Sequence, residues 1–239
     1  MQAVLRPANR LLQVLPAAEF QSLRPHLETV ELAKGTVLTE AGAPIQYVYL
    51  PHGGVVSMMV SLSEGQTVEV AMVGCDSLVG GATAFDDGPA LTEATVVVPG
   101  TASVLKAEEL RAAADQSGIL RRLLARHEQA LLVQAQQSAA CNASHSVESR
   151  LSRLLLRARD LCDSEGLPLT QEFLAQMIGV RRNASGSRPA SHIAARATEP
   201  TAHHISANAG AGERCVYLSI LLANDPCQDH HEFLLHYIL

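Results

Sequence analysis

Short alternations of hydrophobic and polar residues fill the first hundred positions of the chain. Residues 55–62 and 67–73 are rich in Val, Met and Thr, and a Glu-Gly break separates them. Residues 94–98 and 101–105 repeat this pattern around a Pro-Gly break, which predicts a hairpin. Short runs interrupted by glycine about every 8–12 residues are typical of a β-sandwich or barrel. We therefore predict a jelly-roll-like antiparallel β-roll as a domain over residues 1–118.

The pattern changes to a helical period near the end of this region. Strong helix formers fill residues 106–114, and Gly118 interrupts them. From Ile119, hydrophobic residues recur on one helix face, and neither Pro nor Gly occurs before residue 150. A small β-domain cannot cover so long a helix, so we predict that residues 119–146 pack against a second copy in a homodimer. The alternative, a helix that lies across its own β-domain, remains open.

A further helix and a turn signal follow the long helix. Leucines between residues 147 and 161 recur at helical spacing, and the arginines among them lie largely on other faces. Thr170 is suited to cap a second helix, and Gly179 can take the left-handed conformation that a sharp turn requires. This pattern predicts the first helix and turn of a helix-turn-helix, whose second helix normally enters the major groove of DNA. Residues 147–182 would form a partial helix-turn-helix domain, so the whole chain is predicted to be α+β.

Side chains suited to DNA contacts lie within this predicted domain. Arginine can pair with phosphate oxygens or with guanine edges, and polar side chains near a helix N-terminus can bind phosphate. Arg181 and Arg182 stand where a reading helix would begin and are predicted to lie closest to the bases. The remaining predicted contacts, all to the phosphate backbone, are Arg150, Arg153, Arg157, Thr170 and Gln171.

Composition and charge narrow the class of protein. Residues 1–118 carry 6 basic and 13 acidic side chains, whereas residues 119–182 carry 9 and 6. An acidic first part joined to a basic second part fits a two-domain binder of polyanions, although solvated arginine-rich helices would look the same. A hydrophobic fraction of 47% excludes a wholly disordered chain. Because no apolar run could span a bilayer and five scattered cysteines fit reduced thiols, a cytoplasmic protein is expected.

The order of these elements resembles the Crp–Fnr superfamily of bacterial transcription regulators. The resemblance covers about residues 8–182, and it rests on residues 80–88, the helix from 119 and residues 169–182. It implies a cyclic-nucleotide-binding-type β-roll, a dimerisation helix and a C-terminal winged helix that binds palindromic promoter DNA. RNA polymerase is a further partner implied by the resemblance.

One departure from the family pattern concerns the effector. Nucleotide-binding members supply a Glu after the glycine and, some ten residues on, an Arg followed by Ser or Thr. Here these positions hold Gly81 and Leu91, and only Thr92 matches, so we predict no tight binding of cyclic nucleotides. Gly80, Gly81 and Thr92 are candidates for another effector site, because backbone N–H groups can hold a small anion. A tight strand-to-helix corner at Gly80 and Gly81 is the favoured alternative.

A second departure concerns the end of the chain. After Arg182 the sequence reads Asn-Ala-Ser-Gly-Ser-Arg-Pro, which cannot form a stable reading helix because Gly and Pro disfavour it. Residues 183–239 are predicted to be an aberrant, largely disordered tail, and a reading-frame change after codon 182 would explain them. Cys227, His230, His231 and His236 could in principle ligate zinc, but no second pair frames them.

These observations define the predicted function. The chain is expected to be a dimeric DNA-binding regulator of Crp–Fnr type with impaired base-specific reading. The alternative is a dimeric sensor or interaction module that does not bind DNA. No Gly-x-Ser-x-Gly elbow, P-loop or GxGxxG fingerprint is present, so neither an enzymatic activity nor a cofactor is expected.

Overall fold

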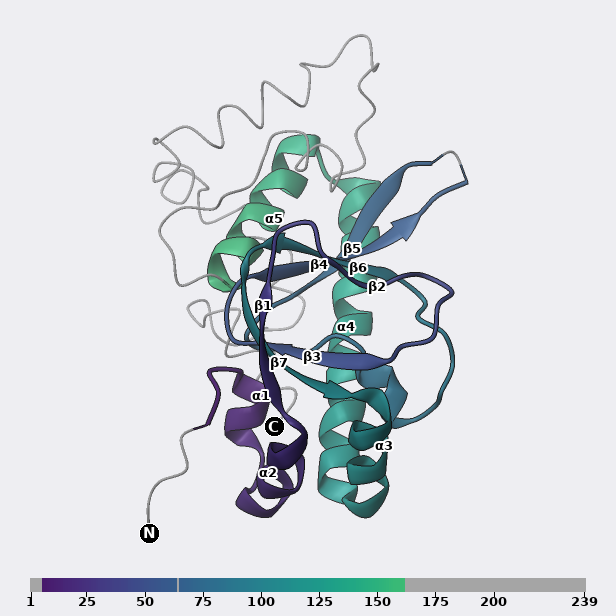
Figure 1. Cartoon of the computed structure of the whole chain (residues 1–239). Coiled ribbons are helices and arrows are strands. Elements are labelled where there is room, and N and C mark those ends of the chain that lie inside the picture. The colour runs from purple at the N-terminus through teal and green to yellow at the C-terminus, as the bar shows by residue number, and fades with distance from the viewer. Residues whose placement is uncertain (1–5, 64, 162–239) are drawn as a thin grey trace, which may run out of the picture.

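The computed structural model describes residues 6–63 and 65–161 of the chain. Within these residues, two antiparallel sheets are followed by a long helix, as Figure 1 shows. The predicted α+β fold with a β-roll and a long helix is therefore confirmed. Most of the predicted helix-turn-helix domain and the whole predicted tail lie outside the described residues.

Two sheets face each other across an aliphatic core. The first sheet has the order β1-β7-β3, with strands Glu28–Leu32, Gly100–Lys106 and Tyr47–Pro51. The second has the order β2-β6-β4-β5, with strands Val37–Thr39, Glu93–Val98, Val55–Ser61 and Thr67–Val73. Inward-facing side chains of both sheets form one buried cluster, because successive residues of a strand point to opposite faces. Members of this cluster are Leu32, Val56, Val73, Val79, Ala94, Val96 and Ala102.

The predicted hairpin around Pro99 is wrong in its pairing. Strands β6 and β7 form where the sequence predicts strands, but β6 pairs with β2 and β4 while β7 pairs with β1 and β3. The chain thus crosses from one sheet to the other at Gly100. A Cβ atom at Gly100 would overlap the carbonyl oxygen of Gly53, and one at Gly54 would lie 2.6 Å from the carbonyl oxygen of Val98. Glycines let the two backbones cross in contact, and the alternation of side chains carries no signal for this crossing.

Two short helices at the start of the chain were not predicted. They are α1 (Arg10–Val14) and α2 (Ala17–Leu23), and the 3-10 helix η1 (Arg24–His26) follows them. The buried side chain of Asn9 caps α1 by accepting from the amides of Leu11 and Leu12. Its Nδ2 also donates to the carbonyl oxygens of Pro51 and Ser77, at 2.9 Å each. Asn9 therefore ties these helices to the β-domain.

The predicted long helix is present as α4 (Gly118–Ser144), after the shorter α3 (Ala107–Gln116). Ser117 caps it by accepting from the amide of Leu120, and 27 residues make it about 40 Å long. One face of α4 packs on the protein's own β-domain and on α3. This agrees with the alternative prediction of a helix that lies across its own β-domain. That buried face consists of Leu120, Leu124, His127, Ala130, Gln134, Ser138 and Cys141. The other face exposes Leu132, which leaves dimerisation through α4 a prediction.

The last described helix is α5 (Val147–Leu161), which turns back from α4 and contacts β5 (Figure 1). Its buried leucines confirm the predicted helix. None of the helices in the described part of the chain is both long and apolar enough to cross a membrane.

Candidate functional site

The loop between β5 and β6 contains Gly80 and Gly81, two of the candidate effector residues. Gly80 has a φ of +89°, in the left-handed region that favours glycine, and it caps the 3-10 helix η2 (Gly81–Ala84). The carbonyl oxygen of Gly80 accepts from the Thr83 hydroxyl at 2.7 Å. Val79 pairs with Tyr49 of β3 through two backbone hydrogen bonds. These contacts form the tight corner that the sequence favours over an effector site.

Gly81 lies against side chains of α4 and has no space beside it. A Cβ atom there would be 2.5 Å from Oε1 of Glu128 and 2.7 Å from Cδ1 of Leu78. Nδ1 of His127 would lie at 3.5 Å. Within the described residues, this position is thus part of the contact between the loop and α4.

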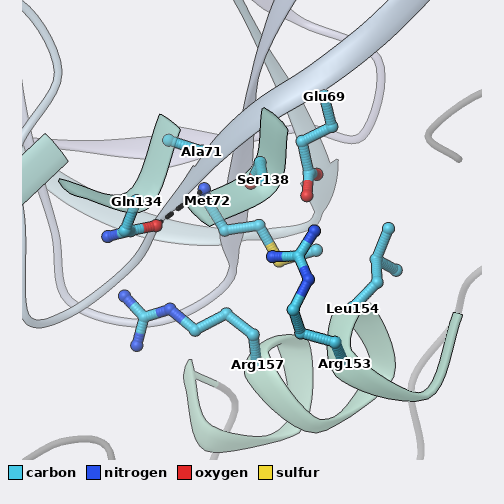
Figure 2. Close-up of a pocket in the computed structure, with 8 residues that line it drawn as sticks. All are labelled: Glu69, Ala71, Met72, Gln134, Ser138, Arg153, Leu154 and Arg157. Atoms are coloured by element: carbon cyan, nitrogen blue, oxygen red, sulfur yellow. Dashed lines mark hydrogen bonds between the residues drawn. The ribbon is translucent and has the colours of Figure 1, made fainter. Parts of the chain in front are cut away.

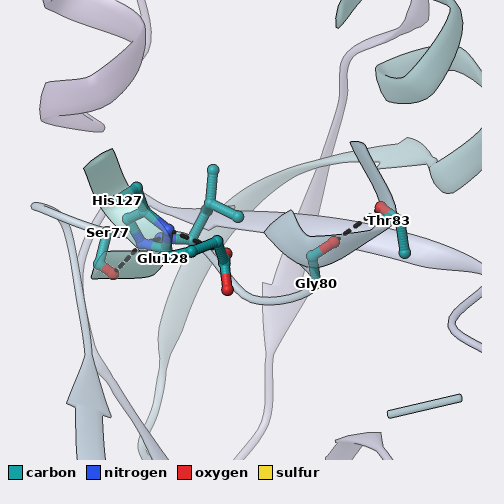
Figure 3. A network of polar contacts seen from close by, with 6 residues as sticks. Ser77, Gly80, Thr83, His127 and Glu128 are labelled. Carbon is teal, nitrogen blue, oxygen red and sulfur yellow. Dashed lines mark hydrogen bonds and ion pairs between the residues drawn. The ribbon is translucent and has the colours of Figure 1, made fainter. Parts of the chain in front are cut away.

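His127 makes the central polar contact of this corner (Figure 3). Its Nε2 lies 2.6 Å from the Ser77 hydroxyl and accepts from the Leu78 amide at 3.2 Å, while Nδ1 lies 3.2 Å from Oε1 of Glu128. A ring nitrogen that accepts from an amide carries no proton, so Nδ1 carries it and donates to Glu128. His127 is only 1% exposed. His127 is buried because α4 packs this face on the protein's own β-domain.

Ser77, His127 and Glu128 have the order of donors and acceptors seen in hydrolase triads. Ser77 is 4% exposed and both atoms of its hydrogen bond are buried, so no substrate can reach the hydroxyl. This network fixes the loop to α4 and is structural.

The third candidate effector residue, Thr92, lies just before β6. Its carbonyl oxygen accepts from the Thr39 hydroxyl at 3.4 Å, at the side of β2. Its neighbour Leu91 is 89% exposed. Leu91 stands where the family resemblance implies an arginine for the cyclic phosphate, and it points into solvent.

A second polar cluster lies between β5, α4 and α5, around a small cavity of about 10 Å³, room for about one water molecule (Figure 2). Glu69 of β5 is buried there and accepts from the Ser57 hydroxyl at 2.8 Å. Burial raises the pKa of Glu69 to about 8, although the hydrogen bond from Ser57 and the charges of Arg153 and Arg157 act in the opposite direction. The Glu69 side chain is therefore protonated at neutral pH.

This protonation predicts a pH-dependent stability. Unfolded Glu69 releases its proton near pH 4.5 and folded Glu69 near pH 8, so folding takes up a proton between these values. The contribution of Glu69 to the free energy of unfolding is therefore highest below pH 4.5. Between pH 4.5 and about 8 it falls by up to about 1.4 kcal/mol per pH unit. The variant Glu69→Gln retains a neutral side chain and should lose this dependence. Urea unfolding of both proteins at several pH values between the two pKa values measures the difference, and equal slopes would contradict it.

Arginines of α5 face this same cluster. Arg157 was predicted to contact DNA phosphate, but in this structure it is only 6% exposed. Its Nη2 lies 2.9 Å from Oδ2 of the fully buried Asp76. Arg153 lines the cavity beside Glu69, and Arg150 is half-buried. The other predicted DNA contacts, Thr170, Gln171, Arg181 and Arg182, lie outside the described residues, as do the histidines and cysteine of the possible zinc set.

The sequence analysis does not single out Asp76 or Glu69. In the structure, Asp76 pairs with Arg157 of α5, and Glu69 lines a cavity with Arg153 and Arg157. Alternation along β5 does not predict the burial of Glu69, because a register shift between Met58 and Met59 places Glu69 on the sheet face of Ser57, opposite to that of Val73. Asp76 lies in a loop, where no periodicity shows which side chains are buried. Within the described residues, no group of three or more His, Cys, Asp or Glu side chains could hold a metal ion.

Comparison with known proteins identifies the class of domain. Residues 29–117 match the cyclic nucleotide-binding domain family. A search of curated protein sequences gives no match. The β-roll thus resembles a cyclic nucleotide-binding domain, although Gly81 and Leu91 replace residues that the family resemblance implies for nucleotide contacts.

Solved structures of transcription regulators have a similar fold. FixK2 from Bradyrhizobium japonicum is 18% identical with a TM-score of 0.59, covering 74% of this chain and 85% of its own. A putative regulator of the Crp/Fnr family from Eubacterium rectale is 14% identical with a TM-score of 0.60, covering 78% and 83%. CLP from Xanthomonas campestris, a global regulator described as responsive to c-di-GMP, is 16% identical with a TM-score of 0.55, covering 76% and 89%. The predicted resemblance to Crp–Fnr regulators is confirmed for the domain and the fold.

Proposed function

We propose that the chain is a transcription regulator of Crp–Fnr type that binds promoter DNA as a homodimer, with weak base-specific reading. The order of its elements is the observation that carries this proposal: a nucleotide-binding-type β-domain leads into α4, and α4 into the arginine-bearing α5. Regulators with a similar fold support it. Residues 1–118 would be the sensor domain, 119–146 the dimerisation helix, 147–182 the partial DNA-binding domain and 183–239 the aberrant tail.

We propose further that the sensor domain responds to an effector other than a cyclic nucleotide. A cyclic phosphate needs a cationic partner where it is taken out of water. The exposed Leu91 supplies none, and a side chain at Gly81 would collide with Glu128 and Leu78. These two positions support a nucleotide-binding fold without nucleotide recognition.

The homodimer would form along the outer face of α4. Ile119 and Leu132 on α4 are 46% and 57% exposed, so apolar side chains of this helix are open to contact with a second copy. A two-fold dimer would present two DNA-binding halves, which fits a palindromic promoter sequence. RNA polymerase would be the partner at such a promoter.

DNA binding by Arg181 and Arg182 is testable by their joint replacement with alanine. Each phosphate contact releases counterions, so the slope of log affinity against log salt should become shallower by up to about two in the variant. Fluorescence anisotropy with a short random duplex, measured between about 50 and 200 mM salt, gives this slope. A palindromic promoter fragment should bind at most a few times more tightly than the random duplex.

Joint replacement of the exposed Arg24 and Lys34 is the matched control, because it removes the same charge outside both the predicted DNA-binding domain and the predicted dimerisation helix. Equal slopes in both double variants would show that the Arg181–Arg182 pair contacts no DNA. Saturable binding that strongly prefers the palindrome would contradict the proposed weakness of base reading.

A second candidate function, a dimeric sensor that does not bind DNA, is favoured by one specific observation. Arg157 is committed to a buried ion pair with Asp76 and cannot reach phosphate in this arrangement. Absence of any DNA binding at low salt would favour this sensor.

A further inference from the structure

The docking of α5 onto the β-domain depends on a close approach at Gly74. The apolar side chains that α5 buries are Leu151, Leu154, Ala158 and Leu161. A Cβ atom at Gly74, directly after β5, would lie 2.7 Å from Cδ2 and 2.9 Å from Cβ of Leu161. Any residue larger than glycine at this position would therefore push the end of α5 away from the β-domain.

A buried ion pair holds the same helix one turn earlier. Nη2 of Arg157 lies 2.9 Å from Oδ2 of Asp76, and the two side chains are 7% and 0% exposed. Asp76 follows Gly74 by two residues, so both contacts come from one loop. Removing one partner of such a pair leaves a buried charge without its counterion, which the structure can relieve only by exposing the other.

Glu69 does not share this role at neutral pH. Glu69 on β5 accepts from Ser57 of β4 and lines the same small cavity as Arg153, Arg157 and Gln134. Because burial raises the pKa of Glu69 to about 8, this group is uncharged there. Asp76 is thus the carboxylate that balances Arg157.

Phosphate and carboxylate compete for the same guanidinium face. Arginine binds both through parallel N–H donors, so the group that faces Asp76 is the group that would face a DNA phosphate. Because Arg157 is only 6% exposed while it pairs with Asp76, a phosphate can reach its guanidinium only when α5 moves away from the β-domain.

We propose that Gly74, Asp76, Arg157 and Leu161 form a latch that holds α5 against the sensor domain, and that release of α5 frees Arg157 for DNA phosphate. The proposal deepens the proposed function, since its second half rests on DNA binding. The latch couples the sensor domain to the DNA-binding half through a contact that an effector-dependent movement of the loop after β5 would break.

Two variants of the full-length chain open the latch by different means. Asp76→Asn removes the counterion of Arg157, and Gly74→Val displaces Leu161 without changing any charge. The control is Asp87→Asn, which makes the same charge change at a side chain that is 82% exposed. Hydrogen–deuterium exchange of the α5 amides reports docking, and anisotropy with a random duplex at low salt reports DNA binding.

The proposal expects α5 amides to exchange about tenfold faster in Asp76→Asn and Gly74→Val than in wild type or Asp87→Asn. Both latch variants should also bind the duplex several times more tightly, with a salt slope steeper by about one. Unchanged α5 exchange in both variants would overturn the latch itself. Faster exchange without a gain in DNA affinity would overturn its gating role, while DNA binding by the wild type leaves the proposed function standing. If no protein binds the duplex although α5 exchanges faster, the gating role falls together with the proposed function.

Discussion

Replacing His127 with alanine should lower the free energy of unfolding by about 3–5 kcal/mol. The imidazole is 1% exposed, so its removal leaves a cavity between α4 and the loop after β5. The Leu78 amide, which donates to Nε2 at 3.2 Å, loses its acceptor inside the protein. Both losses act together, because the same ring fills the buried space and makes the hydrogen bonds. Urea denaturation of the purified protein measures the effect.

Two further variants separate the causes. His127→Phe keeps most of the ring volume and removes the hydrogen bonds, so it should cost about 1–3 kcal/mol. His26→Ala removes an imidazole that is 40% exposed and pairs with Glu109, and should cost less than about 1 kcal/mol. If His127→Ala costs no more than His26→Ala, the contact between α4 and the loop is not the structural anchor described here.

Replacing Gly81 with glutamate should destabilise the protein by about 2–4 kcal/mol. This change restores the acidic residue that the family resemblance implies for nucleotide-binding members. In this chain the new side chain would collide with Leu78 and with Oε1 of Glu128, which accepts from His127. It would also place a second carboxylate beside Glu128. Thermal and urea unfolding of Gly81→Glu against wild type measure the loss.

A double-mutant cycle with Glu128→Ala tests whether this collision is the cause. In the Glu128→Ala background, Gly81→Glu should cost at least about 1 kcal/mol less than in the wild type, because the charge repulsion and part of the steric overlap are gone. Additive losses would place the cause elsewhere, in the contact with Leu78 or in the backbone of η2.

The sequence predicts where helices and strands form better than it predicts which strands pair with one another. Side-chain alternation located β4, β5, β6 and β7, and the helical period located α4 and α5, because these patterns follow from burial of one face. It could not show that β6 and β7 belong to different sheets, since the crossing depends on backbone contact between Gly53 and Gly100. The short helices α1 and α2 were missed, because their fixed position depends on a distant contact from Asn9 to Pro51 and Ser77.

The candidate site shows the same division. The residue type of Gly80 and Gly81 alone indicated a tight corner. The positive φ of Gly80 explains why glycine occurs at this position. The sequence shows the arginines of α5 as a cluster of positive charge. It does not show that Asp76 is the partner of Arg157. Arg157 meets Asp76 across 81 residues of sequence, and helix periodicity does not show which charged face a domain will cover.

The central claim, a cyclic nucleotide-binding fold that does not hold a cyclic nucleotide, is tested most directly by thermal unfolding of the full-length protein with cyclic AMP, cyclic GMP and cyclic di-GMP in turn. A nucleotide at about one hundred times its dissociation constant would add about 2.7 kcal/mol of stability, which raises the melting temperature by several degrees. We expect no change in melting temperature with any of the three nucleotides at millimolar concentration. A saturable rise with any one of them would contradict the central claim.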